Sequence, residues 1–490
     1  MGKGPQALIR YLQTNKIWVL LLFIIVAGRV WLASYIPVME FTEARYAEIA
    51  RKAFVLDQWI PLWYREDQPF WGKPPLAFWS TTLSYYVFGV SELATRLPSI
   101  LYTAATMLVI SCWLRLLDRT ALILSVCFVY SSFFMVLQSA GTILTDPLMT
   151  LCTTTVMLAF WQCLAQEKPP LGWSVLLWSC LGIGLLTKGP VVLVLCGLPC
   201  GVWALTQGRF LKAFRNTWFL PGIVLMLLIA SPWYYLQEQR TPGFLEYFLI
   251  GEHFYRFTEP GWEGDLYGAA KDQPIGMIWL FLLIGLLPWL FIILWELIFR
   301  RDKLFAKALA VEKPLSVYLG LWLLMPTLFF TFAGNIIPTY VIPMLPSAAI
   351  LLVMATTLRP AQIQWLGFVF AVFFFVLLLT AYEFYFKSHK YNQKPVIDEY
   401  HRLNKLDPGP LHYTGAETFS FVFYGGGVAT HGRVWPDSGS PNTKYIAVRD
   451  MWIKSFEPRL KVRCTKQMQQ GDVSFWYCPA INKNGVDDSQ

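Results

Sequence analysis

The chain alternates between long apolar runs and short polar segments over most of its length. About eleven of these runs approach the roughly 17–25 residues that a helix needs to cross a bilayer. The pattern predicts a mainly α-helical, polytopic membrane protein with spans near residues 17–36, 98–116, 120–138, 148–165, 172–187, 189–206, 217–236, 274–299, 316–333, 337–357 and 364–386. A further run, 76–90, is shorter, and we expect it to lie at the membrane interface.

The charged residues support the assignment as a membrane protein and predict its orientation in the membrane. Only 14% of the residues are charged, against roughly 25% in soluble domains. The formal net charge of +9 does not indicate a nucleic-acid partner, because the excess lies in short loops between spans. With eleven spans the basic groups fall on one side, which the positive-inside rule makes cytoplasmic. These groups are Lys3, Arg10, Lys16, Arg115, Arg119, Lys168, Arg209, Lys212, Arg215, Arg300, Arg301, Lys303, Lys307, Lys313 and Arg359.

The opposite, external side receives the loops 37–97 and 237–273, which we expect to carry interfacial helices, and the tail. In a two-membrane bacterium the protein would lie in the inner membrane, with this face in the periplasm. We therefore divide the chain into a membrane domain, 1–386, and an external domain, 387–490.

The tail has a different pattern from the membrane domain. Short alternating or aromatic runs predict strands in a small α/β or mostly β domain. The runs are Thr418–Tyr424, Lys444–Val448, Leu460–Cys464 and Val473–Cys478, and the three glycines from Gly425 read as a turn. Cys464 and Cys478 each end one run in an oxidising compartment, which favours a disulfide, although two free thiols remain the alternative.

Acidic residues gather at the external ends of the spans. Glu40 and Glu43 follow the first span, and Asp146 lies between two apolar runs. A charged group so close to hydrocarbon is costly and usually functional. These carboxylates form a candidate catalytic set: one acts as general base on an acceptor hydroxyl or amine, and another orients the acceptor or steadies positive charge at the reacting carbon.

Cationic residues lie on the same side. Lys73, Lys188, Arg45, Arg256 and His253 would together suit a phosphate or diphosphate leaving group, although each alone could simply reach toward lipid headgroups. No cofactor is certain. Glu252 beside His253 leaves a divalent cation open, but one His and one Glu are fewer ligands than a metal site ordinarily uses.

Six motifs in order resemble a known family. They are Glu40-Phe-Thr-Glu-Ala-Arg-Tyr-Ala-Glu-Ile-Ala-Arg51, Phe70-Trp-Gly-Lys-Pro-Pro75, Thr145-Asp-Pro147, Leu186-Thr-Lys-Gly189, Gly251-Glu-His-Phe-Tyr-Arg-Phe257 and Ile337-Pro-Thr-Tyr340. Over roughly residues 15–350 the chain resembles the bacterial aminoarabinose transferases within the protein mannosyltransferase superfamily of C-type membrane glycosyltransferases. Two positions depart from the family pattern: Thr42, where many members carry an acid, and Gly72, where some do.

The resemblance implies the C-type fold and an inverting transfer of a sugar from a polyprenyl (undecaprenyl) phosphate carrier. The acceptor would be a lipid or glycan of the cell envelope, such as a phosphate of lipid A. Glu40, Glu43 and Asp146 would be catalytic. Donor, acceptor or their phosphates would be bound by Arg45, Tyr46, Lys73, Lys188, His253, Arg256 and Tyr340.

Two other functions remain open. A protein O-mannosyltransferase would share the donor chemistry but bind a peptide. A transporter of lipid-linked sugars would carry inverted repeats and ionisable residues near the middle of the membrane, whereas the acids here cluster at one face.

Overall fold

The computed structural model describes residues 15–65, 67–268, 273–303, 306, 313–414, 418–427, 429–432 and 444–479. The chain forms two compact units. The first, the helical unit, comprises residues up to Ala33 together with Ala53–Phe375, and the second comprises Ser34–Lys52 together with residues from Val376. The basic residues Lys3, Arg10 and Lys307 lie outside the described residues.

Among the described residues, eight helices are long and apolar enough to cross a membrane. The protein is therefore a multi-pass membrane protein of mainly helical fold, as predicted. The eight are α2 (Lys16–Tyr35), α5 (Glu92–Leu116), α8 (Asp146–Ala165), α9 (Leu171–Lys188), α12 (Phe219–Arg240), α17 (Lys313–Phe330), η3 with α18 (Pro338–Ala355) and α19 with η4 (Pro360–Phe386).

The other three predicted runs are helical but are not single long spans. Helices α14 (Met277–Gly285) and α15 (Leu290–Phe299) form a pair bent by 97°. Pro288 lies in the break between them, where its ring and missing N–H prevent a continuous helix. The run 120–138 is divided into η1 (Thr120–Leu122), α6 (Ile123–Ser132) and α7 (Phe134–Ser139), and α10 (Val191–Thr206) is a shorter apolar helix.

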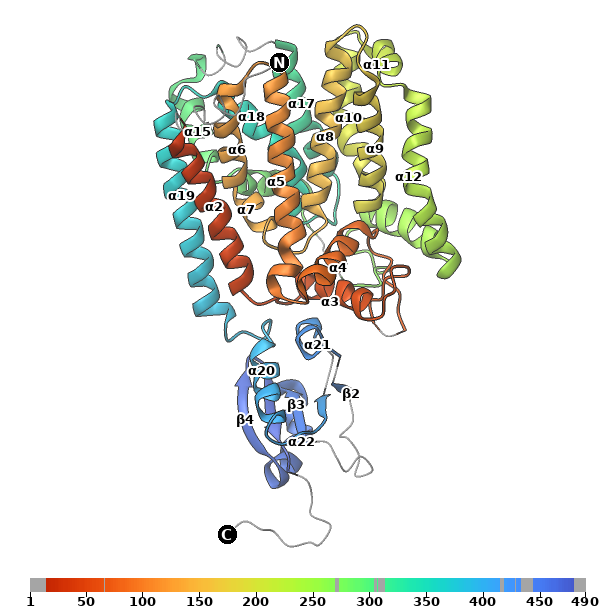
Figure 1. The fold of residues 1–490 in the computed structure, drawn as a ribbon, viewed down its shortest axis with the longest axis vertical. Helices are drawn as coiled ribbons and strands as arrows, with labels where there is room; N and C mark the ends of the chain where they lie inside the picture. The colour runs from red at the N-terminus through yellow and green to blue at the C-terminus, as the bar shows by residue number, and fades with distance from the viewer. Residues whose placement is uncertain are drawn as a thin grey trace. The chain divides into compact units, whose positions relative to one another are not determined.

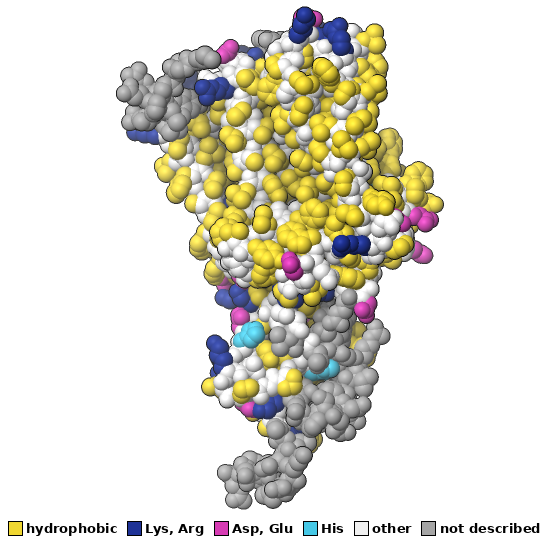
Figure 2. Space-filling view, turned by 45° about the vertical axis from the view of Figure 1, so that its right-hand side comes forward, with side chains coloured by type: hydrophobic (Ala, Val, Ile, Leu, Met, Phe, Trp, Pro, Cys, Tyr) yellow, Lys and Arg dark blue, Asp and Glu magenta, His cyan; other side chains and the backbone are white. Residues whose placement is uncertain are grey.

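Helix α8 lies at the centre of the helical unit, and 89% of its most apolar 18-residue stretch is buried inside the protein. It packs against α5, α9 and α10, and the hydroxyls of Thr150, Thr153 and Thr155 donate to the helix's own carbonyls, so that these polar groups are satisfied inside the bundle. Figure 2 shows the consequence at the surface, where hydrophobic side chains cover the middle of the helical unit and Lys and Arg gather at one end.

Shorter helices occupy the two ends of the helical unit. Helices α4 (Leu76–Phe88) and α11 (Phe210–Asn216) lie at opposite ends (Figure 1). With 13 residues, α4 is too short to cross a bilayer, which supports an interfacial position for the run 76–90. The loop after α12 contains η2 (Glu246–Tyr255), a π-helical segment, followed by α13 (Arg256–Thr258).

The second unit holds α3 (Thr42–Val55) over most of its length and a five-stranded sheet of order β2-β1-β3-β5-β4. Strands β2, β1 and β3 are parallel, and β5 pairs antiparallel with both β3 and β4. The tail is therefore α/β. Its elements are α20 (Lys394–Asn404), β1 (Leu411–Thr414), α21 (Phe419–Gly425), β2 (Thr430–Gly432), β3 (Tyr445–Arg449), α22 (Asp450–Arg463), β4 (Thr465–Gln470) and β5 (Val473–Tyr477).

Two predicted strands are wrong. Thr418–Tyr424 falls on helix α21, and Leu460–Cys464 covers the end of helix α22. The aromatic run in α21 is buried on nearly every side, so its sequence lacks the polar face that distinguishes a helix from a strand. The runs at β3 and β5 are strands as predicted, and Gly426 adopts a left-handed conformation (φ 65°) in the predicted turn.

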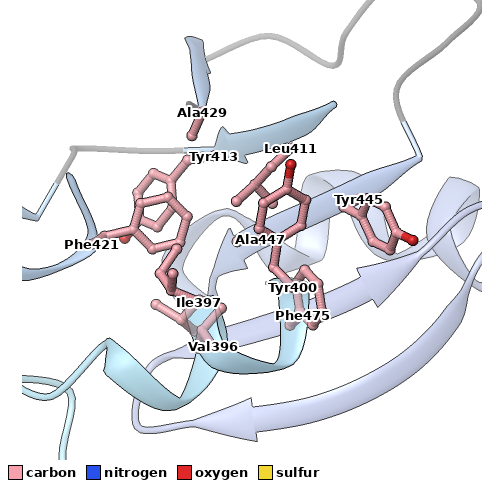
Figure 3. Close-up of a cluster of buried hydrophobic side chains, with 11 residues drawn as sticks. Val396, Ile397, Tyr400, Leu411, Tyr413, Phe421, Ala429, Tyr445, Ala447 and Phe475 are labelled. Atoms are coloured by element: carbon pink, nitrogen blue, oxygen red, sulfur yellow. The ribbon is translucent and has the colours of Figure 1, made fainter. Parts of the chain in front are cut away.

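The core of the tail is formed where α20 meets the sheet (Figure 3). Val396, Ile397 and Tyr400 pack on apolar side chains of β1, β3 and β5. The cysteine pair predicted from the sequence, Cys464 and Cys478, is joined by a disulfide (S–S 2.04 Å) beside a smaller cluster around Leu460 and Trp476.

Candidate active site

Asp146 is the first residue of α8 and is only 2% exposed. The N-terminus of a helix favours a negative charge, and Pro147 suits the first helical turn. Lys188, the last residue of α9, donates from Nζ to Asp146 Oδ1 at 2.6 Å. Its ammonium group also lies 4.3 Å from the centroid of the Tyr340 ring. Two helix ends therefore hold a buried ion pair against an aromatic face.

Gly189 allows this arrangement. Its φ of +82° is in the left-handed region, which ends α9 directly after Lys188. A Cβ here would lie 2.7 Å from the Phe248 ring and 2.8 Å from His253 Nε2. The Leu-Thr-Lys-Gly motif is thus explained by a turn that brings Lys188 close to η2.

Glu252 forms a second charged cluster. Its side chain is 2% exposed and accepts hydrogen bonds from Lys73 (3.1 Å), Arg256 (2.9 Å) and Tyr247 (3.0 Å). Burial acts to raise the pKa of Glu252, but the charges of Lys73 and Arg256 outweigh it and hold this pKa below its usual value. Arg256 also lies 3.5 Å from Asp265, so one carboxylate orients two cations and a second supports the arginine.

His253 lies beside both clusters. Its Nδ1 contacts the Phe248 carbonyl at 2.7 Å, and its Nε2 is 3.4 Å from the carbonyl of Lys188. Burial lowers the pKa of His253, so the imidazole is neutral at neutral pH. The histidine therefore joins η2 to the end of α9 rather than adding a positive charge.

These residues line one cavity of about 180 Å³. Lys73, Asp146, Lys188, Glu252 and Arg256 give it a charged side, and the start of α10 with Phe329 and Phe330 gives it an apolar side. The cations keep donor capacity, because lysine carries three N–H groups and arginine five, and Arg256 Nε makes no hydrogen bond with any residue that the structure describes. The cavity thus suits an anionic group joined to an apolar chain.

Arg29 supports the segment that precedes Asp146. This arginine lies within α2, is 6% exposed and donates from Nη2 to the Gln138 carbonyl at 2.9 Å. A Cβ on Gly141 would lie 2.0 Å from Arg29 Cζ, so the guanidinium rests directly on the Gly141 backbone. A cation inside a membrane span is costly, and here it fixes the turn that leads into α8.

The predicted residues at the start of the first loop, up to Lys52, belong to the second unit. Glu40 accepts a hydrogen bond from the backbone N–H of Ser420 (2.5 Å), and burial raises the pKa of this carboxyl to about 7. Glu43 is half-buried in the first turn of α3. Arg45 and Tyr46 are buried, with the guanidinium 5.4 Å from the tyrosine ring centroid. Grouping Glu40 and Glu43 with Asp146 stays a prediction.

The predicted residues of the helical unit do come together. Lys73, Asp146, Lys188, His253, Arg256 and Tyr340 all line the cavity. Sequence reasoning missed Glu252 as an organising residue, although its i, i+4 spacing to Arg256 on a helical segment was an available signal. It also missed Asn335, which donates to the Arg256 carbonyl at 2.7 Å, and Arg29, for which the signal was a lone charge in an apolar run.

The described residues show no cluster of the side chains that usually bind a metal. No group of three or more His, Cys, Asp and Glu side chains comes together among them. Glu252 is already bound by Lys73, Arg256 and Tyr247, and His253 Nδ1 is held by a backbone carbonyl. The pair that left a divalent cation open is thus engaged in other contacts.

Comparison with solved structures defines the fold class. The chain matches ArnT from Cupriavidus metallidurans bound to undecaprenyl phosphate with a TM-score of 0.72 at 20% identity, covering 94% of this chain and 97% of that one. The apo state of the same protein gives 0.74 at 20% identity, covering 94% and 98%. The fold is the C-type membrane glycosyltransferase fold with a small C-terminal sheet, as predicted.

Comparison of sequences identifies the proteins that this chain resembles. Residues 72–236 match the family model described as dolichyl-phosphate-mannose-protein mannosyltransferase. The chain is 31% identical over 319 residues to the undecaprenyl phosphate-alpha-4-amino-4-deoxy-L-arabinose arabinosyl transferase of Yersinia pestis (strain Pestoides F), covering 63% of this chain and 54% of that relative. The enzyme of the same name from Erwinia tasmaniensis is 30% identical over 317 residues, with the same coverage.

The match therefore spans about half the length of these curated relatives. The resemblance to aminoarabinose transferases within the mannosyltransferase superfamily, inferred from the six motifs, is confirmed.

Proposed function

We propose that the protein is an inverting glycosyltransferase that moves a sugar from a polyprenyl phosphate carrier, such as undecaprenyl phosphate, to an acceptor of the cell envelope. One observation carries this proposal: a cavity at the ends of α8 and α9 joins a buried Asp146–Lys188 ion pair, two further cations and an apolar wall. The names of the relatives support this donor class, since those enzymes are named for a sugar carried on undecaprenyl phosphate.

The leaving group explains the cations. When the bond between the anomeric carbon and the carrier oxygen breaks, the electron pair stays on the carrier phosphate, whose negative charge increases. Lys73 and Arg256, held in place by Glu252, are preorganised to receive that charge in a site of low exposure. Because these groups are fixed before the reaction, little reorganisation is needed in the transition state.

The carboxylates act at the other side of the sugar. An acceptor oxygen forms the new bond to the anomeric carbon from the face opposite the phosphate. We propose that Asp146, with its charge balanced by Lys188, orients the acceptor and steadies the positive character of that carbon. A hydroxyl or amine acceptor must also give up its proton, and this is the general-base role that the sequence predicts for Glu40 or Glu43. An ionised phosphate acceptor, as on lipid A, has no proton to give up.

Membrane orientation fits this chemistry. We propose that the site faces the periplasm from the inner membrane, because Lys188 lies at the end of α9 opposite α11, whose basic residues are predicted to be cytoplasmic. A carrier lipid in the outer leaflet would then present its phosphate to the cavity while its chain stays in hydrocarbon.

A second candidate is a protein O-mannosyltransferase, because the family model that matches residues 72–236 carries that description. The two functions share the donor and differ in the acceptor.

The test supplies the purified protein with defined polyprenyl phosphate sugars and offers envelope lipid extract and envelope protein separately, with mass spectrometry of both. We expect a sugar-sized mass gain on lipid A or another envelope glycan. Gain on protein alone would favour the second candidate, and no consumption of donor across the panel would contradict the glycosyltransferase assignment.

A further inference from the structure

A second cavity lies among the membrane helices, away from the candidate active site. It has a volume of about 400 Å³, and its lining is almost entirely apolar. Helix α9 packs against both α10 and α12 and forms the floor with Leu177, Trp178 and Leu181. Helices α10 and α12 form the walls, and Phe210 and Phe214 of α11 close one end. We call this space the α10–α12 groove.

The groove is left open by two glycines of α10. A Cβ on Gly197 or Gly201 would meet no atom within 4 Å, although both residues line the groove. Glycines four residues apart on a membrane helix usually allow a neighbouring helix to approach closely. Here they border empty space that opens toward the lipid, because Gly197 and Leu193 are exposed at the membrane surface of the unit.

The depth of the groove matches one leaflet. Its lining on α10 runs from Leu193 to Ala204, which corresponds to about 16 Å at ~1.5 Å per residue. The hydrocarbon core of a bilayer is about 30 Å thick. The groove therefore spans about the length available to one acyl chain, starting at the end of the helical unit that carries α11.

That end is cationic. Helix α11 carries Lys212 and Arg215, and Arg209 directly precedes it. The segment before α9 carries Lys168 and the one carboxylate of this region, Glu167. Lys212 donates to Glu167 at 2.7 Å, and this carboxylate is 86% exposed. Lys212, followed by Arg215 and Arg209, lowers the pKa of Glu167, so these cations act on one small region. Basic pockets next to membrane helices favour anionic lipid headgroups.

We propose that the α10–α12 groove binds an acyl chain of an anionic membrane phospholipid whose headgroup lies against the basic residues around α11. The groove shares no lining residue with the candidate active site, whose lining on α10 is Val191, Val194 and Leu195. It needs only the membrane fold and is independent of the proposed transfer reaction. A bound lipid would fill the void between α10 and α12, where α12 is held by its contacts with α9 and α11.

The test fills the groove. Gly201→Leu places a side chain into the open space, and Gly320→Leu on α17 is the matched control, since a Cβ at Gly320 also meets nothing within 4 Å but does not line the groove. Each protein is incorporated into nanodiscs of phosphatidylethanolamine and phosphatidylglycerol and examined by native mass spectrometry. We expect the wild type and the control to retain phosphatidylglycerol, and Gly201→Leu to lose about tenfold in retention.

A second arm tests the headgroup. Replacing Lys212 and Arg215 by glutamine should reduce the preference for phosphatidylglycerol by about fivefold for each charge removed, because a cation near an anionic surface contributes about that factor. Unchanged retention in Gly201→Leu would overturn the proposal. So would a groove that retains polyprenyl phosphate in place of phospholipid, seen as weaker carrier binding in Gly201→Leu.

Discussion

At the scale of single residues, Glu40 has the most informative environment in the second unit. Its pKa is raised from 4.5 to about 7, mainly by burial, while Ser420, Arg45 and Arg449 act in the opposite direction. Between these two pH values the folded protein holds the proton that the unfolded chain releases, so stability falls as pH rises through this window. The shift corresponds to about 3 kcal/mol at ~1.4 kcal/mol per pKa unit.

Glu40→Gln should therefore flatten the pH dependence of stability between pH 4.5 and 7 and should raise the unfolding temperature above pH 7. The measurement is thermal unfolding in detergent across this pH range. Glu399→Gln is the control, because Arg402 lowers the pKa of this half-buried carboxyl and its loss should not produce that change. An unchanged pH profile in Glu40→Gln would show that Glu40 is ionised in the folded protein.

Glu252 provides a second residue-scale prediction. Glu252→Gln keeps an acceptor for Tyr247 but removes the charge that orients Lys73 and Arg256. Breaking a buried ion pair costs about 3 kcal/mol or more. We expect the KM for the polyprenyl phosphate donor to rise by at least about tenfold and kcat to fall as well, because the same cations receive the charge that develops on the leaving group. The exposed Glu246→Gln in the same segment is the control, and equal KM values for both variants would contradict the role of Glu252.

Several residues of the candidate active site could be identified from the sequence by their residue type and position. Asp146 could be identified because a lone acidic residue between two apolar runs is costly and usually functional. Lys188 could be identified because it is a cation at the end of the next predicted span. The contact of Lys73 with Glu252 joins residues 179 positions apart, and no local pattern reports such a pairing. Whether Glu40 and Glu43 act with Asp146 depends on the placement of two units, which spacing along the chain does not encode.

At the scale of elements, the turn between α7 and α8 depends on Arg29 of α2. Gly141→Ala would place a methyl group within 2.0 Å of the guanidinium, which must then leave the Gln138 carbonyl. We expect a loss of about 1–3 kcal/mol in stability, typical of overpacking, and a reduced turnover because Asp146 follows directly. Gly172→Ala on α9 is the control, since a Cβ there meets nothing within 4 Å.

A double-mutant cycle with Arg29→Ala isolates the contact. If the clash causes the loss, Gly141→Ala should cost at least about 1 kcal/mol less when Arg29 is already removed. Additive effects on unfolding free energy and on turnover would mean that Arg29 does not position this turn.

Elements were predictable where their pattern was long. Each of the eleven apolar runs is helical, because any buried segment of that length in lipid must satisfy its own backbone. The failures were short. The sequence of helix α21 predicts a strand because its seven residues are mostly aromatic and five of them are buried, which fits either period, and packing against α20 decides between them. Pro288 indicated a break between α14 and α15, but nothing in the sequence indicated that the two helices would be bent by 97°.

At the scale of the whole molecule, the orientation proposed from charge is testable by labelling. Single cysteines at Glu167, whose side chain is 86% exposed, and at Leu406, which is 76% exposed, lie on opposite sides in the proposed orientation. A membrane-impermeant maleimide should label Leu406→Cys in spheroplasts and Glu167→Cys only after lysis. The wild type, with its native thiols, is the control, and the reverse pattern would contradict a periplasmic site.

The division of the molecule was only partly visible in the sequence. The change in composition after residue 386 indicated a separate tail. The structure groups the segment Ser34–Lys52 with that tail, because Glu40 and Val38 bond to Ser420 and Tyr424. A contact across 380 positions lies beyond any pattern that a single sequence displays.

The central claim is that Asp146 serves transfer rather than binding, within the cavity of the helical unit. The most direct test compares wild type with Asp146→Asn for donor affinity and for sugar transfer to envelope lipid, both on purified protein, with the exposed Asp118→Asn as control. We predict unchanged donor affinity and a loss of transfer of about 10²-fold or more in Asp146→Asn, the scale of one catalytic group. Transfer at the wild-type rate in Asp146→Asn would contradict the account.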